Sequence, residues 1–134
     1  MDWIVPETLA IGTAKDAARA AVLGFKSVVD VAGTLAGLEA EDMGLEAVLS
    51  VRLIDGPGNV PLPFQRAVEA CRQFSDEHAP VLVACEAGKS RSVVVVMAHL
   101  IQVRGWTAEQ ARNWIESRRE TQITAGLERM LRFL

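Results

Sequence analysis

Two apolar runs separated by a short loop constrain the fold of this chain most. The first run, 81–84, ends at Cys85, and the second, 93–101, begins directly after Ser92. The valines of the second run favour a strand by intrinsic propensity. Two parallel strands, however, need a crossover connection of about a dozen residues or more, which the seven residues 85–91 cannot supply. We therefore expect a strand, a tight loop and then a helix that is apolar on most sides.

The remainder of the chain alternates strand-like and helix-like segments. Strands are predicted at 3–5, 9–11, 27–31, 47–54 and 81–84. Helices are predicted at 14–23, 35–43, 64–78, 92–101, 107–117 and from a Thr124 cap to residue 134, with a Pro/Gly-rich loop at 56–63. This order predicts an α/β fold: a central, mostly parallel sheet of four to five strands, flanked by helices on both faces.

Length and composition predict a single domain over residues 1–134. Half of the 134 residues are hydrophobic, which is enough to form a core. No apolar run reaches the length of a membrane span, and the first residues lack the basic and apolar regions of a signal peptide. Two cysteines without a spacing pattern argue against a disulfide framework, so we expect a reducing, cytoplasmic setting.

Charge and ligand spacing exclude several classes of function. The net charge is −3 and the basic residues are scattered, so the sequence predicts no nucleic-acid binding and no stable membrane association. The densest basic group is interpreted as a solvated helix surface. It consists of Arg118 and Arg119, with Arg129 and Arg132 later, interleaved with Glu116, Glu120 and Glu128. His78 and His99 have no ligand-like spacing to the cysteines, so we expect no metal site and no cofactor. We also expect a monomer.

The loop that begins at Cys85 combines a nucleophile with groups that bind anions. The thiol is followed by a turn of backbone amides, which can form an anion-binding nest. Gly88 gives this turn access to positive φ and allows a close backbone approach. Arg91 can hold two oxygens of a phosphate in fork geometry, and the helix that follows adds its positive end. The predicted phosphate-binding residues are Glu86, Ala87, Gly88, Lys89, Ser90 and Arg91. The alternative is that Cys85 is a buried core residue.

This loop resembles the signature of the cysteine-based protein phosphatases, Cys-x5-Arg-Ser/Thr. It is most similar to the dual-specificity branch, in which Cys-x-Ala-Gly-x-Ser-Arg-Ser is common. Weaker similarity extends over most of the chain, through an opening pattern at 9–31 and a closing pattern at Arg119, Ile123 and 126–127. The resemblance implies a tyrosine-phosphatase-like fold and metal-independent hydrolysis of phosphomonoesters through a cysteinyl-phosphate. A phosphorylated protein or a small phosphorylated molecule would then be the substrate.

The resemblance also suggests roles for individual side chains. Cys85 would be the nucleophile, Arg91 would bind the equatorial oxygens, and Ser92 would donate to the sulfur. Asp55 is the candidate general acid, because it follows an apolar strand, opens an Asp-Gly-Pro loop and lies 30 residues before Cys85, a separation similar to the family's. The alternatives are that Asp55 only caps its own turn, or that Asp30 is the acid.

Two features of the loop leave other functions open. The family usually has His before the nucleophile, where this chain has Ala84, so a weakly active phospho-ligand-binding module is an alternative. Lys89 puts a charge in the loop, as in members that act on phosphoinositides, so a small-molecule phosphatase is another. A sulfurtransferase would also place a cysteine in a short anion loop. The short loops at 6–8, 32–44 and 56–63 favour a shallow pocket for phosphotyrosine and for phosphoserine or phosphothreonine.

Overall fold

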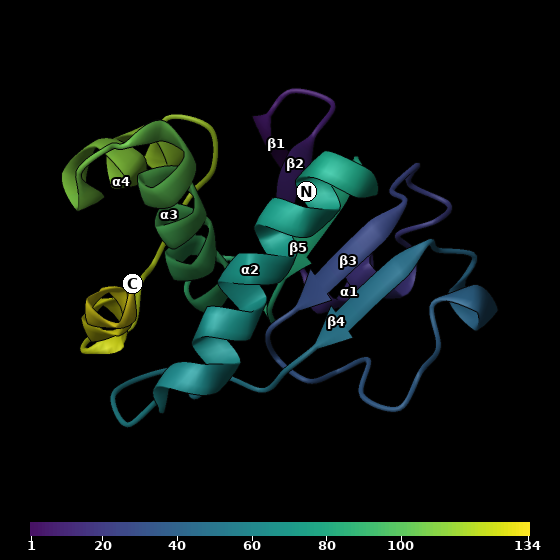
Figure 1. Cartoon of the computed structure of the whole chain (residues 1–134), viewed down its shortest axis with the longest axis horizontal. Helices are drawn as coiled ribbons and strands as arrows, with labels where there is room; N and C mark the ends of the chain where they lie inside the picture. Colours follow the sequence, from purple (N-terminus) through teal and green to yellow (C-terminus); the bar gives the residue numbers. More distant parts are fainter.

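The protein is a five-stranded sheet covered by helices, and the computed structural model describes all 134 residues (Figure 1). The strands are β1 (Asp2–Val5), β2 (Leu9–Gly12), β3 (Ser27–Asp30), β4 (Ala47–Ser50) and β5 (Val81–Ala84). Their order is β1-β2-β5-β3-β4, in which only the β1–β2 pair is antiparallel. The predicted α/β fold with a mostly parallel sheet is confirmed.

Strand β5 lies at the centre of the sheet and separates two hydrophobic clusters. Every residue from Val81 to Ala84 is fully buried. Because successive side chains of a strand point to opposite faces, Val81 and Val83 join the larger cluster, and Leu82 and Ala84 join the smaller one. The same alternation turns Cys85 toward the larger cluster, on the face that α3 covers.

Most of the helical structure covers one face of the sheet. The helices are α1 (Ala14–Ala18), η1 (Glu41–Met43), α2 (Pro61–Glu77), α3 (Arg91–Arg104), α4 (Ala108–Glu116) and η2 (Leu127–Phe133). Buried residues of α2, α3, α4 and η2 form the larger cluster, whereas α1 packs on the smaller one (Figure 1). Residues Ser92 to Leu100 of α3 are all buried, which confirms a helix where propensity alone favoured a strand. None of these helices combines the length and apolar composition of a membrane span.

Several predicted boundaries in the first half of the chain are wrong. Helix α1 has five residues instead of the ten predicted at 14–23, and the chain continues in turns in which Val22 is 78% exposed. The helix predicted at 35–43 is a series of turns with one short 3-10 segment at its end. Strand β4 stops at Ser50 rather than at residue 54. The chain stays beside the end of β3 through the N–H groups of Val51 and Leu53 before it reaches the loop that carries Asp55.

Two helix starts also differ from the prediction. Helix α2 begins at Pro61 rather than at residue 64, because proline has a fixed φ that suits the first position of a helix. The last helix begins at Leu127 after Gly126, not at a Thr124 cap, and it is a 3-10 helix. Thr124 instead lies in the turn before this helix: its hydroxyl and its N–H both bond the side chain of Ser90, and its carbonyl accepts from the N–H of Leu127.

Candidate active site

The loop from Cys85 to Ser90 connects the end of β5 to the start of α3. Cys85 is 3% exposed, and its Sγ lies 3.1 Å from the hydroxyl oxygen of Ser92, which is the second residue of α3. The two side chains meet because the thiol leaves the end of the strand while the first turn of the helix passes beside it. A hydroxyl at this position can donate a hydrogen bond to a sulfur anion.

The four carbonyl groups of Glu86 to Lys89 all accept hydrogen bonds from outside the loop. The N–H of Ala14 donates to Glu86 (3.1 Å) and the N–H of Gln122 donates to Lys89 (2.8 Å). The guanidinium of Arg119 donates through Nη2 to Ala87 (3.3 Å) and through Nε to Gly88 (2.6 Å). Since the C=O and N–H of a peptide unit point in opposite directions, the amides of the loop face away from these partners. This is the arrangement of an anion-binding nest.

Gly88 is the residue at which the loop tolerates no side chain. Its φ of 67° is in the left-handed region. A Cβ added here would lie 2.5 Å from both the carbonyl oxygen of Gly12 and a guanidinium nitrogen of Arg119. The positive φ expected from the sequence is present, and the close backbone approach is to the end of β2.

Arg91 lies across the loop from the thiol. Its Nη1 donates to the carbonyl oxygen of Leu53 at 3.1 Å, which fixes one end of the guanidinium. Its Nε is buried and has no hydrogen-bond partner in the protein. A buried donor without a partner is costly, so a ligand oxygen at this position would satisfy it.

Asp55 lies on a short turn above the same cavity. Its Oδ1 accepts a hydrogen bond of 2.8 Å from the hydroxyl of Ser90. The turn is closed by Asn59, whose side chain bonds both the N–H and the C=O of Ile54 at 2.8 Å. These two contacts close the turn that carries Asp55.

The predicted site residues therefore line one cavity of about 590 Å³. Its walls are formed by the following residues: Asp55, Cys85, Glu86, Ala87, Lys89, Ser90, Arg91, Gln122, Ile123, Thr124 and Ala125. Gly88 and Ser92 do not line the cavity. Gly88 lies against Gly12 at the end of β2, and the hydroxyl of Ser92 bonds the thiol of Cys85. A nucleophile, a guanidinium, a nest of amides and a carboxylate thus meet at the carboxyl end of a central parallel strand, where α/β sheets bind ligands.

Comparison with known proteins identifies the family. The model of the dual specificity phosphatase catalytic domain matches residues 9–132. The chain belongs to this family.

Similar proteins support this assignment. The protein-tyrosine-phosphatase IBR5 of Arabidopsis thaliana is 29% identical over 119 residues, which are 87% of this chain and 43% of IBR5. The crystal structure of human DUSP28 superposes with a TM-score of 0.80 at 26% identity, covering 98% of this chain and 93% of DUSP28. That of PTPMT1 gives a TM-score of 0.75 at 25% identity and covers 98% and 92% of the two chains. The chain thus spans less than half of the length of IBR5.

Arg119 is the main residue of this phosphatase domain that sequence reasoning misplaced. The interpretation of Arg118 and Arg119 as a solvated surface is wrong for Arg119, whose side chain is only 10% exposed. Besides its two bonds to the loop, it donates through Nη1 to Asp2 at 2.7 Å. Its place in the closing pattern of the family was the one available signal. Arg118 instead stacks on the ring of Trp114.

Lys89 and Asp30 occupy different surroundings. Lys89 is at the rim of the cavity, 39% exposed, with its Nζ 3.8 Å from Glu120. Asp30 is 1% exposed and accepts hydrogen bonds from the N–H groups of Ala32 and Leu35 and from the hydroxyl of Ser50. With these hydrogen bonds the carboxylate of Asp30 holds the turn after β3. Asp30 does not line the cavity.

The second cysteine is unsuited to chemistry. Cys71 is fully buried in the larger cluster, and burial raises the pKa of its thiol to about 12. A thiol with such a pKa has almost no thiolate near neutral pH and is a poor nucleophile. Cys71 is therefore a core residue.

Proposed function

We propose that this chain hydrolyses phosphomonoesters on proteins through a cysteinyl-phosphate intermediate. The observation that carries the proposal is the outward bonding of the four carbonyls from Glu86 to Lys89. It leaves the amides of the loop free to bind the oxygens of a phosphate directly above the thiol of Cys85. Membership of the dual specificity phosphatase family supports the same reaction class.

In the first step the thiolate of Cys85 attacks phosphorus and an S–P bond forms. The P–O bond to the leaving group breaks, and the carboxylic acid of Asp55 gives its proton to the departing oxygen. The three equatorial oxygens carry the charge of the transition state, and they lie among the loop amides and the guanidinium of Arg91. Asp55 and Cys85 line the same cavity.

In the second step water attacks the phosphorus of the intermediate. Asp55, now a carboxylate, accepts a proton from this water, the S–P bond breaks, and inorganic phosphate is released. The thiolate that leaves is stabilised by the hydroxyl of Ser92, which lies 3.1 Å from Sγ. The enzyme returns to its initial state without a cofactor, because both steps use only groups of this chain and water.

The cavity favours a phosphorylated side chain over a buried small molecule. The turns around it are short, and its rim carries the polar side chains of Lys89 and Gln122. We propose phosphotyrosine as the main substrate, with phosphoserine and phosphothreonine also accepted. A phosphoinositide is the second candidate, because Lys89 lines the cavity and could meet a second phosphate. A solved structure of the similar protein PTPMT1 holds PI(5)P.

The test measures hydrolysis of a small aryl phosphate in the presence of a chelator. We expect turnover in the wild type, loss of turnover in Cys85→Ser and retention in the matched control Cys71→Ala. An acid-quenched reaction of Asp55→Asn should contain protein whose mass has increased by one phosphoryl group, carried on Cys85. Turnover that survives in Cys85→Ser would rule out the mechanism. Binding of phosphopeptides without Cys85-dependent turnover would favour the binding-module alternative.

The substrate class is tested separately. Phosphopeptides and soluble phosphoinositides are compared with the wild type and with Lys89→Ala. A more than tenfold preference for the phosphoinositide that Lys89→Ala abolishes would replace the protein substrate and leave the chemistry at Cys85 unchanged.

A further inference from the structure

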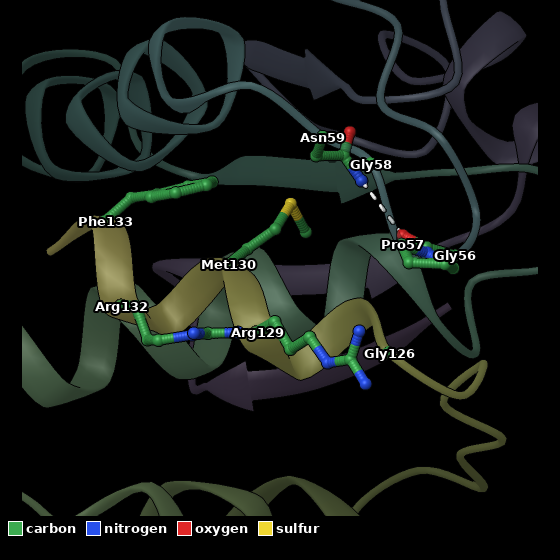
Figure 2. Close-up of a pocket in the computed structure, with 9 residues that line it drawn as sticks. All are labelled: Gly56, Pro57, Gly58, Asn59, Gly126, Arg129, Met130, Arg132 and Phe133. Carbon is green, nitrogen blue, oxygen red and sulfur yellow. Dashed lines mark hydrogen bonds between the residues drawn. The ribbon is translucent and has the colours of Figure 1, made fainter.

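Figure 2 shows a second cavity of about 400 Å³, some of whose lining residues are sequence neighbours of residues in the proposed active site. One wall is the turn Gly56 to Asn59, which directly follows Asp55, and the other wall is η2. Nothing in the proposed reaction uses this cavity. We infer that it receives an acidic group of the same peptide substrate, next to the phosphorylated residue. This inference rests on the proposed function and names a feature of its substrate.

Two segments of backbone contribute residues to both cavities. Asp55 and Ala125 line the first cavity, and their sequence neighbours Gly56 and Gly126 line the second. The segments touch each other, because a Cβ added at Gly126 would lie 3.2 Å from the ring of Pro57. A substrate whose phosphate enters the first cavity therefore has its adjoining residues within reach of the second.

The charged side chains of the second cavity have one sign. Arg129 and Arg132 line it, and neither makes an ion pair or a side-chain hydrogen bond. No acidic residue is among the nine that line it. Since residues three apart eclipse each other on a 3-10 helix, the two arginines share one face of η2, and Figure 2 shows them extended along it. An anion between them would relieve their repulsion and can be held in fork geometry.

The adjacent face of η2 carries Met130 and Phe133, which also line this cavity and anchor the helix. Met130 is 3% exposed, and Phe133 packs edge-on against Phe64 of α2 with ring centroids 6.3 Å apart. Figure 2 shows both apolar side chains pointing away from the arginines. The helix cannot rotate without exposing them, so the two guanidinium groups are carried by an anchored element.

The surroundings of the cavity favour a peptide over a free polyphosphate. Ile54, Val60 and Leu62, on either side of the turn, are 55%, 62% and 63% exposed. An extended peptide can cover such apolar side chains while it places an acidic group between the arginines. A small molecule whose polar groups are all phosphates has no apolar surface to place there.

The experiment moves one acidic residue along a peptide. A neutral host peptide with one phosphotyrosine carries serine, glutamate or phosphoserine at each flanking position in turn, and kcat/KM is measured for release from the tyrosine. We expect one position at which the acidic forms are preferred over serine by about tenfold. Arg129→Gln/Arg132→Gln should reduce that ratio to about one, whereas the matched control Arg66→Gln, an exposed arginine on α2 outside both cavities, should keep it. Comparison of glutamate with phosphoserine shows whether a carboxylate suffices.

Binding to Cys85→Ser separates this inference from the proposed function. The same peptides are titrated by fluorescence anisotropy, so the preference is measured even if the wild type has no turnover. If Cys85→Ser with both arginines present binds all the peptides with equal affinity, whatever the position of the acidic residue, the inference is overturned. The inference is also overturned if the preference for an acidic residue survives in Arg129→Gln/Arg132→Gln, or if that double variant loses equal affinity for neutral and acidic peptides. A dependence on both arginines that appears with soluble inositol phosphates but not with acidic peptides would overturn the assignment to a peptide.

Discussion

Ser90 links the carboxylate and the phosphate loop at the level of single residues. Its side chain is 8% exposed, donates to Asp55 and accepts a hydrogen bond of 2.9 Å from the N–H of Thr124. Because Ser90 is also the residue before the first turn of α3, the position of the proposed acid is tied to the start of the helix that carries Arg91. The turn that holds Asp55 is closed independently by Asn59.

Replacement of Asp55 by Asn should identify the general acid. The amide cannot donate the proton of a carboxylic acid, so we expect a loss of roughly 10²–10⁴-fold on substrates with poor leaving groups. The loss should shrink as the pKa of the leaving alcohol falls. Asp76→Asn, on the exposed face of α2, is the control and should keep wild-type rates. A uniform loss across leaving groups would move the assignment away from Asp55.

At the level of elements, strand β5 decides which residue can precede the nucleophile. Ala84 is fully buried in the smaller cluster with Ala10, Ala17 and Ala20. The small side chains of this cluster allow α1 to pack closely on the sheet. A histidine at position 84, as is usual in the family, would have to fit among these buried side chains.

Ala84→His should therefore destabilise the fold instead of simply restoring a family feature. Overpacking of a well-packed core costs about 1–3 kcal/mol. We expect a lower urea midpoint, measured by circular dichroism, whereas the exposed control Ala36→His should leave the midpoint unchanged. An unchanged midpoint in Ala84→His would mean that the cluster accommodates the ring.

Helix α3 carries a buried histidine that should make stability depend on pH. Burial lowers the pKa of His99 from 6.5. The unfolded chain thus binds a proton near pH 6.5 while the folded protein does not. Stability should fall as the pH is lowered from about 6.5 toward the folded pKa.

His99→Gln removes this proton, so its urea midpoint should depend less on pH between about 6.5 and 5. Chemical denaturation at several pH values measures the effect, and His78→Gln, at the end of α2, serves as the control. A slope equal to that of the wild type in His99→Gln would show that other groups cause the dependence.

Prediction from the sequence succeeded where local chemistry determines the element and failed where distant contacts do. The strand, loop and helix from Val81 to Arg104 followed from apolar runs and a short connection. Cys85, Arg91 and Asp55 could be brought to one site on the strength of spacing and resemblance. Thr124 and Arg119 could not be placed, because their partners Ser90, Gly88 and Asp2 are 31 or more residues away. The length of α1 likewise depends on its packing against the sheet, which the local sequence does not determine.

On the scale of the whole molecule, Arg119 connects the loop to the edge of the sheet. It is the one side chain that bonds both the phosphate loop and β1, through Gly88 and Asp2. The adjacent segment contributes the N–H of Gln122 to the carbonyl of Lys89. The shape of the loop is therefore determined by parts of the chain that precede and follow it.

Arg119→Gln should weaken the binding of vanadate, an oxyanion that resembles phosphate. Loss of a hydrogen bond to a charged group costs about 1.5–3 kcal/mol, part of which we expect in anion affinity because two loop carbonyls lose their donor. Inhibition constants measure the effect. Arg119→Lys should recover part of it, and Arg118→Gln, which alters only the contacts with Trp114 and Ser117, should not weaken inhibition. Unchanged inhibition in Arg119→Gln would show that the loop keeps its shape without this brace.

The outward bonding of the loop carbonyls has a consequence for protein engineering. Their donors are Ala14, Arg119 and Gln122, and the space behind Gly88 is filled by Gly12. The conformation of the loop is thus held by the sheet and by the segment after α4. In a denaturant titration the loop should therefore lose its anion affinity together with the global fold. Grafting residues 85–92 into another scaffold would transfer the sequence of the loop without the contacts that hold its backbone conformation.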